Sequence, residues 1–107
     1  MDLRELEGAL AALSVFSPTS FPVHHAQVFL VVAARGQVTY QEIEEALNLT
    51  NSTVSRTVHA LGETHRKGYQ GHGLLEVYND PEEGRRYLVR LTAKGKALLR
   101  QLEGIKS

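Results

Sequence analysis

Cysteine, a long apolar run and a secretory signal are all absent from the sequence. It contains no cysteine, which excludes a disulfide framework, thiolate zinc sites and thiol redox chemistry. The longest apolar run, residues 28–34, is far too short to span a bilayer, and the N-terminus lacks the basic stretch and apolar core of a secretory signal. These absences predict a soluble protein with no membrane attachment, and we expect it to be cytoplasmic.

Motifs of common enzyme chemistry are also absent. No glycine-rich phosphate loop follows a predicted strand, and no serine lies in the strand-turn-helix context of a nucleophile elbow. Five histidines are present, but none forms an i, i+4 pair, and the neighbours His24 and His25 would point in different directions on a helix. We therefore expect a protein that is not an enzyme, with no metal site and no cofactor.

The net charge is zero, which at first argues against a nucleic-acid partner, because phosphate binding draws on clustered lysine and arginine. The distribution of charge changes this view. Residues 1–49 hold two basic and six acidic side chains, whereas residues 50–107 hold ten basic and six acidic ones. Six basic residues of the second half follow one another without an acidic residue between them: Arg85, Arg86, Arg90, Lys94, Lys96 and Arg100. They predict a local basic surface, although a solvated helix face shows the same pattern.

The length suits one domain with a real core, so residues 1–107 are expected to form a single domain. A first helix is predicted over residues 1–16. Its leucines form a stripe of the coiled-coil type: Leu3, Leu6, Leu10 and Leu13. Such a stripe needs a partner, which is either the body of the same domain or another chain.

Residues 22–35 are predicted to form the second helix. Pro22 suits a first helical turn and Gly36 suits a C-terminal cap. The β-branched run inside this segment is also compatible with a strand, but the length and the caps favour a helix. Because the segment is apolar on most sides, we expect a buried helix at the centre of the packing.

A third helix is predicted over residues 40–47, because Thr39 and Glu42 have the spacing of a capping box. Its core face is expected to hold Ile43, Ala46 and Leu47. Asn48 is a suitable helix stop, and Thr50 offers a side-chain oxygen as the N-cap of the next helix. A short helix, a tight turn and a second helix make a helix-turn-helix.

The fourth helix is predicted to run from Thr50 to about Thr64. Its apolar residues recur at helical spacing and should face the core: Val54, Val58 and Leu61. Short polar side chains and one arginine lie on the other face and its flank: Asn51, Ser52, Ser55, Arg56 and His59. Such a face can lie in a major groove and hydrogen-bond base edges and phosphates, although a solvated amphipathic helix shows the same pattern.

Residues 65–73 form a predicted loop with three glycines. Residues 74–78 and 87–91 then read as two strands, with turn signals between them, and Arg85 and Arg86 lie at the tip of this hairpin. Thr92 is the expected cap of a last helix. The predicted fold is mainly α with a small two-stranded antiparallel wing, in the order α-α-α-α-β-β-α, which is a winged helix-turn-helix.

At this point the chain resembles the MarR family of winged-helix transcription regulators, over about residues 22–102. One segment that carries the resemblance is STVSRTVHAL, residues 52–61, and the more specific one is DPEEGRRYLVRLTAKGKALL, residues 80–99. In the family an Asp-x-Arg at the wing precedes a strand that ends in Leu-Thr, with a glycine three residues later. The matching residues are Arg85, Leu91, Thr92 and Gly95, whereas Glu83 replaces the aspartate.

The resemblance implies a transcription regulator, of the repressor type, that binds double-stranded DNA. Arg85 would enter the minor groove, as suits an arginine beside a narrow, negative groove. The residues placed in the major groove by the resemblance are Ser52, Thr53, Ser55 and Arg56. Arg86 is either a second DNA contact or an exposed charge on the strand, because side chains alternate along a strand.

Members of the family are usually longer and dimerise through their terminal helices. We expect a homodimer in which residues 1–16 and 92–107 provide the interface. A small-molecule effector is compatible with the resemblance, but nothing in the sequence supports one. The alternative function is a winged-helix module for protein interaction, or for replication or segregation machinery, without sequence-specific DNA readout, and the neutral net charge favours it.

Overall fold

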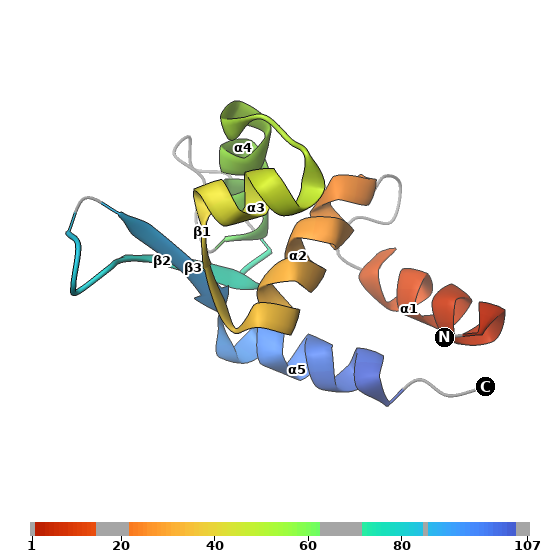
Figure 1. Cartoon of the computed structure of the whole chain (residues 1–107). Helices are drawn as coiled ribbons and strands as arrows, with labels where there is room; N and C mark the ends of the chain where they lie inside the picture. Colours follow the sequence, from red (N-terminus) through yellow and green to blue (C-terminus); the bar gives the residue numbers. More distant parts are fainter. Residues whose placement is uncertain (1, 15–21, 63–71, 85, 105–107) are drawn as a thin grey trace.

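Five helices and three strands make up the part of the chain that the computed structural model describes, residues 2–14, 22–62, 72–84 and 86–104 (Figure 1). None of these helices combines the length and hydropathy needed to cross a bilayer. In chain order the elements are α1 (Leu3–Ser14), α2 (Val23–Arg35), β1 (Gln37–Thr39), α3 (Tyr40–Leu47), α4 (Asn51–Leu61), β2 (Leu75–Asn79), β3 (Tyr87–Leu91) and α5 (Ala93–Glu103).

Helix α2 is the central packing element, as its apolar sequence predicted. It contacts α3, α4, β1 and β3, and Val28, Phe29 and Val32 are fully buried. The expectation that the helix is buried on most sides is wrong, because Leu30 is 49% exposed. At 3.6 residues per turn the three buried residues share one face and Leu30 lies outside it. A helix can therefore look apolar nearly all round and still have a solvent side.

The sheet has three antiparallel strands, one more than the predicted hairpin. Gly36 ends α2 with a φ of 86°, a conformation that favours glycine, and the chain continues directly into β1. This short strand pairs with β3, with Val38 opposite Val89, and β2 pairs with the other edge of β3. The sequence did not reveal β1, because three residues are too few for an alternating pattern and its pairing partner lies in the other half of the chain.

Helix α4 is shorter than predicted. It ends at Leu61, and the N–H of Gly62 donates to the carbonyl of His59 at 3.2 Å. The predicted end, Thr64, and most of the predicted loop lie outside the described residues. Backbone hydrogen bonds join residues 60–62 to residues 72–74. The segment that leads into β2 therefore lies beside the end of α4. The wing is thereby attached to the helix-turn-helix.

A close contact between two backbone segments joins the wing to α5. The hydroxyl of Thr92 accepts from the N–H of Gly95 at 3.0 Å and donates to the carbonyl of Gly73 at 2.6 Å. A Cβ atom on Gly95 would lie 2.2 Å from the carbonyl oxygen of Leu74, a distance that van der Waals repulsion forbids. The threonine therefore ties α5 to the base of the wing, and the glycine lets the two segments approach.

Helix α1 is covered only in part by the rest of the domain. It contacts α5, and Leu13 is 4% exposed, whereas Leu3 and Leu10 remain 82% and 54% exposed. Figure 1 shows α1 at the opposite end of the molecule from the wing. The described part of the chain therefore buries one end of the leucine stripe and leaves the other end exposed to solvent.

Candidate nucleic-acid interface

Helices α3 and α4 form the predicted helix-turn-helix. The capping box of α3 is present, since the hydroxyl of Thr39 accepts from the N–H of Glu42 at 3.1 Å and the Glu42 carboxylate accepts from the N–H of Thr39 at 3.0 Å. Asn48 ends α3 in the left-handed conformation, with a φ of 55°, which asparagine tolerates better than most residues. The Thr50 hydroxyl then caps α4 by accepting from the N–H of Thr53.

The core face of α3 differs from the prediction at one residue. Ile43 is fully buried, and Tyr40 and Leu47 pack against the core, but Ala46 is exposed. On a helix Tyr40 and Leu47 lie on the same side of Ile43, whereas Ala46 lies on its other flank. The face that meets the core is therefore centred between Ile43 and Leu47.

Helix α4 is held by a buried face that packs on α2 and α3. Val54, Val58 and Leu61 are fully buried, as predicted, and Thr57 is buried beside them. The hydroxyl of Thr57 donates to the carbonyl of Thr53 at 2.8 Å, so its burial leaves no unmatched donor. Apolar periodicity alone did not identify Thr57, because threonine carries a polar hydroxyl and does not count as an apolar position in such a pattern.

The other face of α4 presents the side chains that were predicted to contact DNA. Exposed on it are Asn51, Ser52 and Arg56, and half-buried are Thr53, Ser55 and His59. The Nε of Arg56 donates to the carbonyl of Ser52 at 3.3 Å, so the guanidinium is directed back along the helix. This face offers one permanent positive charge and several short donors and acceptors, which is a set suited to base edges and phosphates.

The tip of the wing is closed by an ion pair. Both Nε and Nη2 of Arg86 donate to the carboxylate of Asp80, and the other Asp80 oxygen accepts from the N–H of Glu82 at 2.9 Å. These hydrogen bonds lower the pKa of the Asp80 carboxyl, and the bond from Arg86 has the largest effect. Arg86 is half-exposed and is thus engaged within the wing. Arg85, the predicted minor-groove residue, lies outside the described residues.

Polar side chains from all three strands interact on the outer face of the sheet. The Nε of Arg90 donates to the Glu76 carboxylate at 2.6 Å, and the Arg90 guanidinium lies 4.1 Å from the centre of the Tyr78 ring. The Tyr78 hydroxyl donates to Gln37 at 2.6 Å. Three members of the predicted basic surface, Arg90, Lys96 and Arg100, line one hollow between the sheet and α5, whereas Arg86 lies on the wing.

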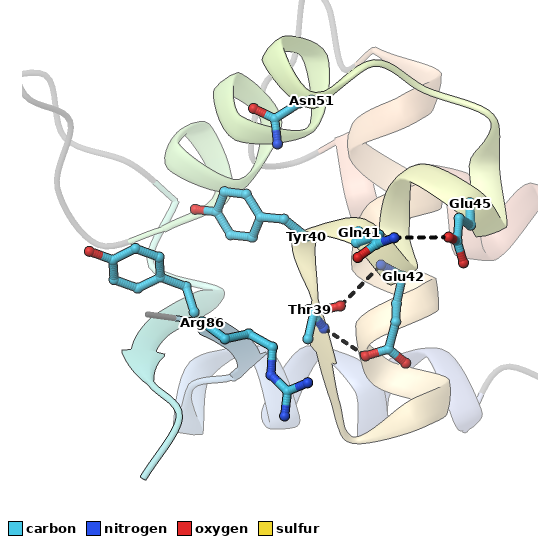
Figure 2. Close-up of a pocket in the computed structure, with 8 residues that line it drawn as sticks. Thr39, Tyr40, Gln41, Glu42, Glu45, Asn51 and Arg86 are labelled. Atoms are coloured by element: carbon cyan, nitrogen blue, oxygen red, sulfur yellow. Dashed lines mark hydrogen bonds between the residues drawn. The ribbon is translucent and has the colours of Figure 1, made fainter. Parts of the chain in front are cut away.

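A hollow of about 510 Å³ lies between the starts of α3, α4 and β3 (Figure 2). It is lined by Thr39, Tyr40, Gln41, Glu42, Glu45, Asn51, Arg86 and Tyr87. Burial has the largest effect on the pKa of the Tyr40 phenol and raises it, and the neighbouring Tyr87 raises it further. Sequence reasoning did not single out Tyr40 or Tyr87, because only the pairing of β1 with β3 brings their segments together.

The two carboxylates of this hollow already have partners. Glu42 accepts from the N–H of Thr39, and Glu45 accepts from the side-chain amide of Gln41 at 3.3 Å, as the dashed lines in Figure 2 show. Arg86 is paired with Asp80 on the wing. Of the charged side chains that line the hollow, two are acidic, and the one basic side chain is engaged with Asp80.

The histidines do not converge on a metal site in the described ranges, where no group of three or more histidine, aspartate or glutamate side chains has a suitable arrangement. Burial, followed by the proximity of His24 and His72, lowers the pKa of His25. His59 is half-buried on α4, and His65 lies outside the described residues.

A winged-helix DNA-binding domain model matches residues 23–95, from the start of α2 to the glycine that packs on the wing. The chain belongs to this family. The match includes every element of the helix-turn-helix and the whole wing. No curated protein matches the sequence.

Solved structures of MarR-type regulators share the fold. A mutant MarR from E. coli complexed with operator DNA is 20% identical, with a TM-score of 0.67, over 94% of this chain and 67% of that one. PcaV from Streptomyces coelicolor, in complex with its natural ligand, is 29% identical, with a TM-score of 0.63, over 95% of this chain and 67% of that one.

BpsR from Bordetella bronchiseptica, whose DNA binding is regulated by 6-hydroxynicotinic acid, is 23% identical, with a TM-score of 0.64, over 95% of this chain and 68% of that one. Together with the family match, these structures confirm the resemblance to the MarR family and the winged helix-turn-helix fold. They leave the side chains of this chain's own interface as predictions.

Proposed function

We propose that this winged-helix protein is a sequence-specific transcription regulator that binds double-stranded DNA, with α4 in the major groove and the wing in the minor groove. The observation that carries the proposal is the division of α4 into two faces. One is fully buried against α2 and α3, and the other is a row of short polar side chains with one arginine. A helix of this kind can enter a major groove without loss of its support.

In this proposal the residues of α4 that contact DNA are Asn51, Ser52, Thr53, Ser55, Arg56 and His59. Arg56 is the strongest candidate for base discrimination, because a guanidinium can donate two hydrogen bonds to guanine. Its bond to the Ser52 carbonyl joins two exposed groups and can be exchanged for a bond to DNA at little cost.

The wing would contribute Arg85 to the minor groove. Arg86 remains a candidate contact, but its bonds to Asp80 support a different contribution, which is to hold the wing in shape so that Arg85 can reach the groove. The negative potential of a narrow minor groove attracts an inserted arginine.

We further propose a homodimer, with residues 1–16 and 92–107 at the interface. The exposed part of the α1 stripe supports it, since Leu3, Leu6 and Leu10 together present an apolar surface that a monomer rarely leaves open. In such a dimer the two copies of α4, which act as the recognition helices, would be related by a two-fold axis. They would contact two half-sites of the DNA about one helical turn apart. A monomeric mass at micromolar concentration would contradict this part of the proposal.

Similar proteins were solved with operator DNA, and BpsR is regulated by a small acid. By analogy we propose that this chain acts as a cytoplasmic repressor and not as an enzyme. A bound effector is not part of the proposal.

The proposal is tested by selecting bound sequences from random duplex DNA and then comparing three variants on the preferred duplex. Arg56→Ala should reduce discrimination by about tenfold at one base pair, and Arg85→Ala should weaken binding to all duplexes. Arg35→Ala is the matched control, because it removes the same charge from the exposed end of α2, next to α5 in Figure 1. Equal binding by all three variants and the wild type would overturn the assignment of the site.

One observation favours the alternative, a module that binds protein. The hollow between α4 and the wing is lined by Glu42 and Glu45, and its only described cation, Arg86, is already paired. Such a surface repels phosphate more than a typical DNA-binding surface does. A failure of the wild type to bind any duplex at low salt would favour this alternative.

A further inference from the structure

Glu44 forms hydrogen bonds at the turn between α3 and α4 through both its backbone carbonyl and its side chain. Its backbone carbonyl accepts from the N–H of Asn48 and from the N–H of Leu49, the latter at 3.1 Å. Its side chain reaches past the turn, and one carboxylate oxygen accepts from Nδ2 of Asn51 at 3.2 Å. The same residue therefore closes the turn and holds the first side chain of the recognition helix.

This bond defines which way the Asn51 amide faces. A carboxylate only accepts hydrogen bonds, so the NH₂ group of Asn51 must be the group that faces Glu44. One of its two N–H donors is used in this bond, which leaves the carbonyl oxygen and the second N–H available. An acceptor beside a donor is the pattern that asparagine presents to N6 and N7 of adenine in a major groove.

The local surroundings favour this contact. Glu44 is half-buried and Asn51 is exposed, and the first turn of α4 has no acidic residue of its own. The carboxylate from α3 thus lies beside the positive end of the α4 dipole, where a negative charge is stabilising. Asn51 also lines the hollow that faces the wing, as Figure 2 shows.

We propose that Glu44 is a positioning residue that orients the Asn51 amide for the reading of adenine at one position of the bound DNA sequence. The proposal rests on the proposed function, because it requires α4 to enter a major groove. It assigns a role in recognition to a residue that does not itself touch a base.

A change in charge alone would also alter DNA binding, and Glu45 separates the two effects. Glu45 is the next residue of α3, is exposed and bonds only to Gln41 among the described contacts. Glu44→Ala and Glu45→Ala each remove one negative charge beside α4, so both should raise the affinity for all duplexes to a similar extent. Only Glu44→Ala also releases the Asn51 amide.

The experiment measures the preference for adenine over the other bases at each position of the duplex that the wild type selects. We expect Asn51→Ala to abolish the preference at one position, and Glu44→Ala to reduce it there by about tenfold. Glu45→Ala should keep the preference. Glu44→Gln should also keep it, because the amide oxygen of glutamine can still accept from Asn51. Thermal unfolding of each variant establishes that it is folded.

Two results would overturn the inference while leaving the proposed function intact. One is an adenine preference that Glu44→Ala retains as fully as Glu45→Ala does. The other is an Asn51→Ala variant that loses no preference at any single position. Absence of DNA binding by the wild type would instead overturn the proposed function, and this inference with it.

Discussion

Helix α4 and the tip of the wing flank the same hollow, but different interactions hold them in place. Three apolar side chains of α4 are fully buried, and its polar face takes almost no part in its support. The wing tip is shaped by the ion pair of Asp80 with Arg86 and by hydrogen bonds within the turn. The helix is thus fixed by packing, whereas the wing tip is fixed by charge.

The two parts of the candidate interface should therefore respond to different solution conditions. Apolar packing does not depend on pH or salt in the mild range, whereas a partly exposed ion pair depends on both. The position of α4 should therefore stay constant across solution conditions, and the shape of the wing should change with acid.

The largest expected effect is at the base of the wing, where packing and not charge holds the chain. Gly95→Ala places a Cβ atom 2.2 Å from the Leu74 carbonyl oxygen, so α5 and the wing must separate. We expect a loss of about 4 kcal/mol of unfolding free energy, measured by chemical denaturation. Gly84→Ala, in the wing turn, has nothing within 4 Å of the new atom and should change stability little. Equal stability of the two variants would contradict the close contact.

The second effect disturbs the buried face of α4. Leu61→Ala removes a fully buried side chain and should cost about 3 kcal/mol. The matched control is Leu30→Ala, because Leu30 is 49% exposed and the same truncation leaves no cavity. The folded fraction of Leu61→Ala should prefer the same DNA sequence as the wild type does. A stability loss as large for Leu30→Ala would refute the assignment of the buried faces.

The smallest effect disturbs the charge that shapes the wing tip. The hydrogen bond from Arg86, then that from the Glu82 N–H, lowers the pKa of Asp80 below its ordinary value of 3.8. A carboxyl with a lowered folded pKa adds stability above its ordinary pKa, and this stability is lost as the pH falls through the folded value.

Asp80→Asn should therefore reduce stability at neutral pH by less than Leu61→Ala does. It should also remove part of the stability loss that the wild type shows below about pH 4. Acid titration of both proteins, followed by circular dichroism, measures this. Glu82→Gln is the control, because its exposed carboxylate has no recorded ion pair in the described wing. Identical acid profiles of the wild type and Asp80→Asn would refute a role for this ion pair.

Local signals predicted most of the fold. The N-terminal caps of α3, α4 and α5 are Thr39 with Glu42, Thr50 and Thr92. They were predictable because a cap depends on residues only three positions apart. The positions of Val54, Val58 and Leu61 also follow from helical spacing alone. The third strand did not follow, because β1 exists only through its pairing with β3.

The candidate site was predictable to the extent that it lies on one element. The polar face of α4 could be derived from periodicity, but the link between Glu44 and Asn51 crosses a turn, and the hollow needs three elements to form. Thr57 and Ala46 show the limit in the core, because the first is polar yet buried and the second is apolar yet exposed. Helical spacing does place Thr57 on the buried face of α4, three residues after Val54, but a pattern of apolar residues omits a threonine. Ala46 lies on the flank of α3 that turns away from the core, and only the packed structure shows where the core lies.

We propose that α4 and the wing together bind one DNA sequence in preference to others. The affinities for the selected duplex and for a scrambled duplex of equal composition, measured over a salt series, test this proposal. We predict that both affinities fall steeply with salt and that the selected duplex binds more tightly at every salt concentration. Equal affinity for the two duplexes, or no binding to either at low salt, would contradict the claim.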